Sequence, residues 1–227
     1  MYCDFCSFPG RPEDFGPYLS ALKRELAARW DPGWTVATLY LGGGTPTILP
    51  PTALADLIGA VKAVALLQPG AEVTVEANPG TIDGEGLAQL WAAGVNRLSL
   101  GAQSGDNRLL KRLGRAHTTD DLERTVALAR QVGFTNINLD LIFGLPGETI
   151  DDWRQTLRWA TALRPEHLSC YGLQLEAGTP LFRMAQAGEI RLPAEEEVSA
   201  MFLAGIQILQ AAGYEQYEIS NFARRSR

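Results

Sequence analysis

Three consecutive glycines follow a short apolar stretch early in the chain and could bind a small anionic or amino-acid group. They are Gly42, Gly43 and Gly44, and Thr45 and Pro46 come next. Because glycine has no Cβ, a bound molecule can lie directly against the backbone N–H groups of such a turn. A plain strand-to-helix turn has a similar composition. The motif alone therefore leaves both interpretations open.

Polar side chains stand at the carboxyl ends of the later predicted strands. In sheets of parallel strands, ligands bind beyond these ends, so the side chains should form one rim with the glycine run. The rim residues are Glu76 and Asn78, Gln103 and Ser104, Asp140 and Ile142, and Tyr171, Gln174 and Glu176. Each polar residue singly could be a solvated loop end. Together they suit a ligand rich in hydroxyl and amine groups.

The three cysteines, at positions 3, 6 and 170, are too few for a disulfide framework. Cys3 and Cys6 form a C-x-x-C pair that could hold zinc or act in redox chemistry, but no second such pair or histidine pair accompanies it. We interpret Cys6 as a loop or small core residue, and Cys170, which alternates with apolar residues, as core. We expect His117 to cap a helix and His167 to be structural.

Predicted strands and helices alternate along the chain, which requires a parallel sheet with right-handed crossovers. Helices are expected at 17–30, 53–67, 84–93, 106–113, 120–132, 149–162 and 195–212. Strands are expected at 36–41, 72–76, 97–100, 137–142 and 167–173, with a candidate sixth at 217–220. Five or six strands are too few for a closed eight-stranded barrel. The pattern predicts an α/β fold in which the parallel strands form a partial TIM-like barrel.

A weak internal repeat supports this architecture. Gly94, Gly133 and Gly213 are each followed by an apolar residue, two polar residues and another apolar residue. We expect each glycine to end a helix in the left-handed conformation just before a strand. The first two are 133 − 94 = 39 residues apart, and the last two are 213 − 133 = 80 apart. One strand-helix unit therefore occupies about forty residues.

Composition narrows the class of protein. The chain has 227 residues, 46% of them hydrophobic, which suffices for one α/β domain with a sizeable core. Its net charge of −6, with Lys and Arg scattered among acids, argues against a nucleic-acid partner. The most apolar helix candidate, 53–67, is too short and too charged for an integral membrane segment. Without a signal peptide, we expect a cytoplasmic location.

The motifs, taken in order, resemble those of the radical S-adenosylmethionine (SAM) superfamily. They are Tyr2-Cys3-Asp4-Phe5, Gly42-Gly43-Gly44-Thr45-Pro46, Glu76-Ala77-Asn78-Pro79 and Gly144-Leu145-Pro146-Gly147-Glu148-Thr149. The run from Gly213 to Ala223 resembles the oxygen-independent coproporphyrinogen III oxidase family, and within it the HemW branch of heme chaperones. The resemblance implies a partial (β/α)6 barrel with a [4Fe–4S] cluster and SAM at its strand ends, where the cluster cleaves the cofactor to a radical.

The resemblance also implies roles for individual residues. Cys3 matches the third cluster cysteine, and Tyr2 matches the aromatic residue near the adenine. The methionine part of SAM would be held by Gly43, Gly44 and Thr45.

Four further positions match residues around the same cofactor. Glu76 matches a carboxylate near the amino group of SAM, and Arg115 matches the arginine that pairs with its carboxylate. Gln103 and Asp140 match polar groups on the ribose, and Ile142 matches a residue packed by the adenine. A guanidinium suits a carboxylate, and acceptors suit ribose hydroxyls.

The cluster motif departs from the family pattern. A C-x-x-x-C-x-x-C motif ending at Cys3 would place two cysteines before residue 1, and the family's first barrel strand is missing as well. We therefore expect a truncated chain, with an incomplete radical SAM core over 1–223 and the start of a missing C-terminal region at 224–227. The oxidases carry an extra cysteine two positions after the third ligand, but Cys6 follows Cys3 by three. This spacing favours the HemW branch.

Four functional hypotheses remain open. The first is a heme chaperone that binds heme or a porphyrin and hands it to heme-accepting proteins, with an electron donor for the cluster. The second is an oxidase that decarboxylates the propionates of coproporphyrinogen III. The third is a non-catalytic fragment lacking two cluster cysteines. The fourth, a partial-barrel enzyme for a phosphorylated metabolite, lacks the expected late phosphate loop.

Overall fold

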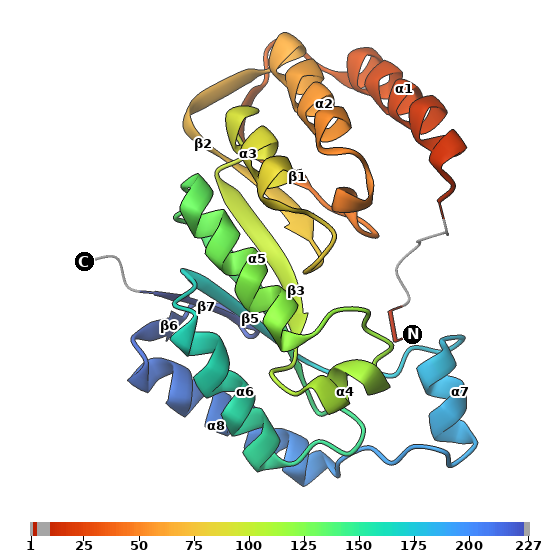
Figure 1. Ribbon diagram of the computed structural model, residues 1–227, viewed down its shortest axis with the longest axis vertical. Helices are drawn as coiled ribbons and strands as arrows, with labels where there is room; N and C mark the ends of the chain where they lie inside the picture. The colour runs from red at the N-terminus through yellow and green to blue at the C-terminus, as the bar shows by residue number, and fades with distance from the viewer. Residues whose placement is uncertain (1, 4–9, 225–227) are drawn as a thin grey trace.

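The computed structural model describes residues 2–3 and 10–224 and contains one curled, seven-stranded sheet. Its strand order is β1-β2-β3-β4-β5-β7-β6, so β1 and β6 are edges and the sheet is an open half-barrel (Figure 1). The first five strands are parallel, as predicted. They are β1 (Thr35–Leu41), β2 (Leu66–Ala77), β3 (Arg97–Gln103), β4 (Ile137–Phe143) and β5 (His167–Gly172).

Helices cover one face of this sheet (Figure 1). They are α2 (Pro51–Val64), α3 (Gly84–Ala92), α5 (Thr119–Val132), α6 (Ile150–Ala162) and α8 (Glu195–Ala211). Helix α1 (Pro12–Arg29) contacts α2, where Lys23 pairs with Asp56. The short helices are η1 (Pro46–Ile48), α4 (Asn107–Arg112) and α7 (Pro180–Gln186), of which η1 and α7 were not predicted.

The two faces of the sheet differ in chemistry because side chains alternate along each strand. Toward the helices, residues such as Val75, Leu100, Leu139 and Leu168 are fully buried in one core. Polar residues occupy the other, concave face. Among them are Tyr40, Glu76, Ser99, Asn138, Asp140, His167 and Ser169. The functional residues must therefore be sought on the concave face and at the strand ends.

The expected sixth strand at 217–220 is wrong. These residues form the turn between β6 (Tyr214–Gln216) and β7 (Asn221–Arg224), which are antiparallel. The Glu218 carboxylate closes the turn because it accepts hydrogen bonds from the Ser220 N–H at 3.0 Å and from Nδ2 of Asn221 at 2.7 Å. Side-chain bonds of this kind favour a turn over a strand.

Two other expectations about element ends had different outcomes. Helix α2 ends at Val64 and not at the expected residue 67, and residues 66–77 form β2. In the pairing of β1 with β2, Val36 lies opposite Leu67 and Thr38 lies opposite Glu72. Residues 68–71 of β2 therefore lie opposite the single residue 37 and form a bulge. In contrast, the glycines that were predicted to end helices are confirmed in the left-handed region. Their φ values are 96° at Gly94, 121° at Gly133 and 89° at Gly213.

Candidate functional site

The glycine run lies beside Glu76 at the ends of β1 and β2. Oε2 of Glu76 accepts a hydrogen bond from the Gly43 N–H at 3.2 Å, and Oε1 accepts one from the Tyr40 hydroxyl at 2.7 Å. A Cβ on Gly42 would lie 2.7 Å from Cε1 of Tyr40 and 3.1 Å from Cδ of Glu76, so any larger residue would have to displace these side chains. Gly43 has φ +133° and open space around it, which leaves its backbone accessible to a ligand.

Asn78 joins this glycine turn to Arg115. Its Nδ2 donates to Oγ1 of Thr45 at 2.7 Å, and its Oδ1 accepts a hydrogen bond from Nη2 of Arg115. Nη2 of Arg115 also donates to the Gly101 carbonyl at 3.2 Å. Among the described residues, the buried Nε of Arg115 has no hydrogen-bond partner. A buried donor without a partner is costly unless something binds it.

Gln103 is the second rim residue with an unused polar atom. It is 7% exposed, and its Oε1 finds no partner in the described part of the chain. Its φ of 57° is unusual for a residue other than glycine and turns the end of β3. A Cβ on Gly101 would lie 3.1 Å from Nε2 of Gln103 and 3.2 Å from Nη2 of Arg115. The glycine therefore lets Gln103 and Arg115 approach each other.

Asp140 lies on the concave face of β4 and is held by hydroxyl and amide donors. Its Oδ2 accepts from Ser99 Oγ and its Oδ1 from Asn138 Nδ2, each at 2.9 Å. Burial raises the pKa of the Asp140 carboxyl, and the hydrogen bonds from Ser99 and Asn138 oppose that rise. The site thus contains a second acceptor carboxyl besides Glu76.

An apolar patch completes the rim. Ile142 packs with Leu109, Leu113 and Leu145, and Tyr2 lies against this cluster. Burial raises the pKa of the Tyr2 hydroxyl, and the nearby Arg115 guanidinium lowers it. Tyr2 lies beside Leu109 of α4, near the carboxyl end of β4. The structure therefore brings together all nine residues predicted for cofactor binding. They are Tyr2, Gly43, Gly44, Thr45, Glu76, Gln103, Arg115, Asp140 and Ile142.

Other candidate residues lie elsewhere. Ser104 is fully buried and faces Thr156 of α6, so it does not belong to the rim. The expectation that His117 caps a helix is wrong, because Thr118 caps α5 and the buried imidazole of His117 faces the Ala102 carbonyl. Cys170 is in the core, as expected, where burial raises the pKa of its thiol.

Sequence reasoning missed three residues that contact the site. Tyr40 holds Glu76, and Ser99 and Asn138 hold Asp140. The signal for Ser99 and Asn138 was the polar alternation within β3 and β4, which marks the concave face, and Tyr40 lies on the same face of β1. Burial and the neighbouring Glu76 raise the pKa of the Tyr40 hydroxyl, so it remains a donor.

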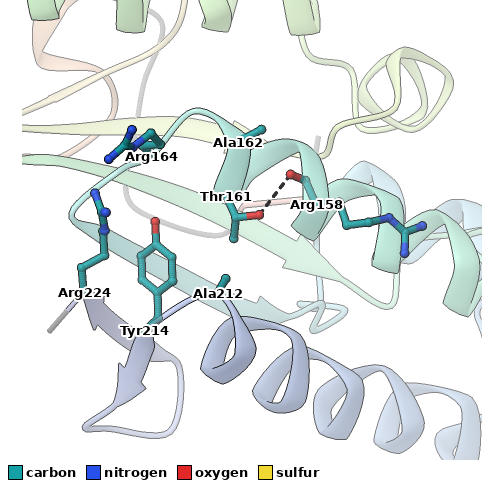
Figure 2. Close-up of a pocket in the computed structure, with 7 residues that line it drawn as sticks. All are labelled: Arg158, Thr161, Ala162, Arg164, Ala212, Tyr214 and Arg224. Atoms are coloured by element: carbon teal, nitrogen blue, oxygen red, sulfur yellow. Dashed lines mark hydrogen bonds between the residues drawn. The ribbon is translucent and has the colours of Figure 1, made fainter.

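A surface cavity of about 380 Å³ lies at the opposite end of the sheet. Figure 2 shows the Tyr214 ring beside the Arg224 side chain and below Arg164, with the Arg158 guanidinium directed away. The Tyr214 hydroxyl donates to the Pro165 carbonyl at 2.7 Å. Residues at the amino ends of barrel strands serve stability more often than catalysis. None of the predicted site residues lines this cavity.

The rim fits SAM better than it fits an iron–sulfur cluster. Arg115 Nε can donate to a carboxylate, and Gln103 Oε1 can accept from an amine or hydroxyl. A [4Fe–4S] cluster needs several thiolates, but the described residues offer the exposed Cys3 alone at this rim, and Cys6 lies outside them. No group of three or more potential metal ligands occurs in the described ranges. In the same part of the chain, no helix could span a membrane.

Comparisons with known proteins agree with this geometry. The heme chaperone HemW of Bacillus subtilis (strain 168) is 38% identical over 230 residues, covering 98% of this chain and 60% of that protein. The mitochondrial radical S-adenosyl methionine domain-containing protein 1 of Mus musculus is 39% identical over 225 residues, covering 98% of this chain and 51% of that protein. The radical SAM enzyme coproporphyrinogen III oxidase (HemN) from Escherichia coli has a similar structure, with a TM-score of 0.86 and 29% sequence identity. The match covers 98% of this chain and 52% of that enzyme.

The chain thus spans little more than half the length of these relatives. The model of the radical SAM superfamily matches residues 1–160, which is more than half of the chain. This superfamily implies a [4Fe–4S] cluster and SAM. The chain is a member of the radical SAM superfamily.

Proposed function

We propose that this chain is the SAM-binding core of a heme chaperone similar to HemW. The observation that carries the proposal is the pair of unpartnered polar atoms, Arg115 Nε and Gln103 Oε1, whose side chains both approach Gly101. Buried polar atoms without partners are rare in folded proteins. A ligand with both a carboxylate and hydroxyl or amine groups would satisfy them.

The methionine part of the cofactor would lie across the glycine turn. Arg115 would pair with its carboxylate, because a guanidinium donates from a fixed, planar fork. Glu76 would accept from its amino group, since a carboxylate can accept about four hydrogen bonds and two come from Tyr40 and Gly43. Gly44 and Thr45 continue the backbone surface beneath it.

The nucleoside would occupy the middle of the rim. Gln103 and Asp140 would accept from the ribose hydroxyls, and Ile142 and Tyr2 would pack against the adenine. A bound cluster would supply the electron that cleaves the sulfonium of SAM, with Cys3 as the ligand from this chain. The described residues do not complete a cluster site, so we derive no step through it.

Heme is the proposed cargo, since the Bacillus subtilis relative is named a heme chaperone. Heme-accepting proteins and an electron donor would be its partners, in the cytoplasm. The structural similarity to coproporphyrinogen III oxidase favours a second candidate, oxidative decarboxylation of that porphyrinogen. The two functions share the SAM site and differ in what happens to the tetrapyrrole.

The test uses the complete product of the gene that encodes this chain. SAM binding is measured by calorimetry, heme binding by Soret absorption, and coproporphyrinogen III turnover by mass spectrometry of the product. Binding of SAM and heme without loss of propionate carboxylates supports the proposal. Decarboxylation without heme binding would establish the oxidase, and absence of SAM binding would overturn both functions.

A further inference from the structure

A chain of hydrogen bonds crosses the concave face from the turn after β6 to Asp140. The Tyr217 hydroxyl contacts Nε2 of His167 at 2.7 Å, and Nδ1 of His167 contacts Oδ1 of Asn138 at 2.6 Å. Nδ2 of Asn138 donates to Ser99 Oγ at 2.8 Å and to Oδ1 of Asp140 at 2.9 Å. Nothing in the proposed cofactor site itself requires His167 or Tyr217.

With Asp140 ionised, chemistry fixes the direction of every bond in this chain. The carboxylate of Asp140 can only accept, so the amide nitrogen of Asn138 must face it and the amide oxygen must face His167. That oxygen cannot donate, so Nδ1 of His167 carries the proton. Nε2 of the neutral ring is then an acceptor, and the Tyr217 hydroxyl donates to it. All donors therefore point toward Asp140.

The surroundings of His167 keep the ring neutral. Burial and the nearby Arg97 guanidinium lower the pKa of His167 to about 4. Ser169 adds a second, longer bond of 3.3 Å to Oδ1 of Asn138. His167 thus makes the shorter of these two bonds to the amide oxygen. Without either donor, the amide could rotate and turn its oxygen toward the carboxylate.

We propose that His167 is a positioning residue of the SAM site: through Asn138 it holds the Asp140 carboxylate ready to accept the ribose hydroxyls, and Tyr217 fixes its tautomer. This inference rests on the proposed function, which places the ribose at Asp140. It extends the site to a residue of β5 and to a turn 77 positions after Asp140 (217 − 140 = 77). Asp140 and the His167 ring lie on the same concave face, joined through β4.

The test compares two isosteric substitutions of the full chain. His167→Asn keeps a donor close to the position of Nδ1, whereas His167→Leu has the same shape and no donor. Calorimetry measures the dissociation constants of SAM, adenosine and 2′,3′-dideoxyadenosine. We expect about fivefold weaker SAM binding in His167→Leu, from the typical worth of one hydrogen bond, and less than twofold change in His167→Asn. Preference for adenosine over its dideoxy analogue should fall in His167→Leu only.

Tyr18→Phe is the matched control for Tyr217→Phe. Tyr18 is 59% exposed on α1 and is remote from the relay, by which we mean the hydrogen-bond chain from Tyr217 to Asp140. Long-range ¹H–¹⁵N spectra should show His167 with its proton on Nδ1 and should show its ring resonances shifting when SAM binds. Tyr217→Phe should weaken that tautomer preference, and Tyr18→Phe should not. These spectra decide the question even if His167→Leu fails to fold.

The outcomes separate this inference from the proposed function. If the wild-type chain binds no SAM, the proposed function fails and the inference fails with it. If the wild type binds SAM, the inference alone is overturned by unchanged affinity and ribose preference in His167→Leu. If His167→Leu does not fold, the inference is overturned when the His167 ring resonances of the wild type do not shift on SAM binding.

Discussion

Asn78 accepts a hydrogen bond from the Arg115 guanidinium and thereby links the turn before α3 to the loop after α4. The other side of the same amide donates to Thr45, so one side chain fixes both the glycine turn and the arginine. Arg115 is thus positioned before any ligand binds. Such preorganisation reduces the entropy that binding would otherwise cost.

Replacing Arg115 by lysine should weaken SAM binding by about tenfold or more. Lysine keeps the charge but loses the planar fork that can engage Asn78, Gly101 and a carboxylate together. The measurement is calorimetric titration with SAM. Arg124→Lys is the control, because Arg124 is 73% exposed and its ion pair with Asp121 is long, at 4.0 Å. Equal SAM affinity of Arg115→Lys and wild type would show that the Arg115 guanidinium does not bind SAM.

Gly42→Ala should weaken SAM binding by about threefold to tenfold with little loss of stability. The new methyl group would displace the Tyr40 ring and with it the hydrogen bond to Glu76, which is worth about 1 kcal/mol. Gly59→Ala is the control, since Gly59 lies in α2 and a Cβ added there would have no atom within 4 Å. It should raise the free energy of unfolding by about 0.5 to 1 kcal/mol and leave SAM affinity unchanged.

Sequence reasoning found the rim because strand ends can be located from local patterns. Gly43 and Glu76 each follow or end an apolar run, Asp140 interrupts the apolar run of β4, and parallel strands end at one edge. The relay through Asn138 could not be found in this way. It depends on the register that sets Ser99 opposite Asn138 and Asn138 opposite His167, which is decided by packing across the sheet.

The errors have a similar origin. Tyr217 and Ile219 alternate with polar residues and therefore suggest a strand, but the Glu218 side chain closes a turn there. Pro69 and Gly70 usually end a helix, but here they lie in a bulge of β2. In both cases a side-chain bond or a cross-strand pairing overrode a local preference.

Glu148→Gln should stabilise the protein above pH 7. Glu148 is 5% exposed, its Oε2 accepts from the Leu145 N–H at 2.9 Å, and its Oε1 has no partner among the described residues. Burial raises the pKa of this carboxyl to about 7. The folded state therefore holds a proton that the unfolded state releases above about pH 4.5, so wild-type stability should fall as the pH rises from 4.5 to 7.

The glutamine variant should lack this decline. At pH 8 it should be more stable than wild type by on the order of 2 kcal/mol, and below pH 4.5 the two should be similar. Urea unfolding across this pH range makes the measurement. Glu189→Gln, at an exposed position, should follow the wild-type curve. Parallel pH profiles for Glu148→Gln and wild type would contradict the assignment of the slope to Glu148.

Arg164 occupies the position after α6 that Gly94 occupies after α3, and its φ of 55° is likewise left-handed. A residue with a Cβ is disfavoured there by about 1 kcal/mol relative to glycine. Its backbone carbonyl accepts from Arg130 at 3.0 Å, a bond that glycine can keep. Arg164→Gly should therefore raise the free energy of unfolding by about 1 kcal/mol. Arg158→Gly, within α6, should lower it by a similar amount. Urea unfolding measures the free energy of unfolding of both variants. If the Arg164 side chain instead stabilised the fold, both variants would be less stable than wild type, which would contradict this prediction.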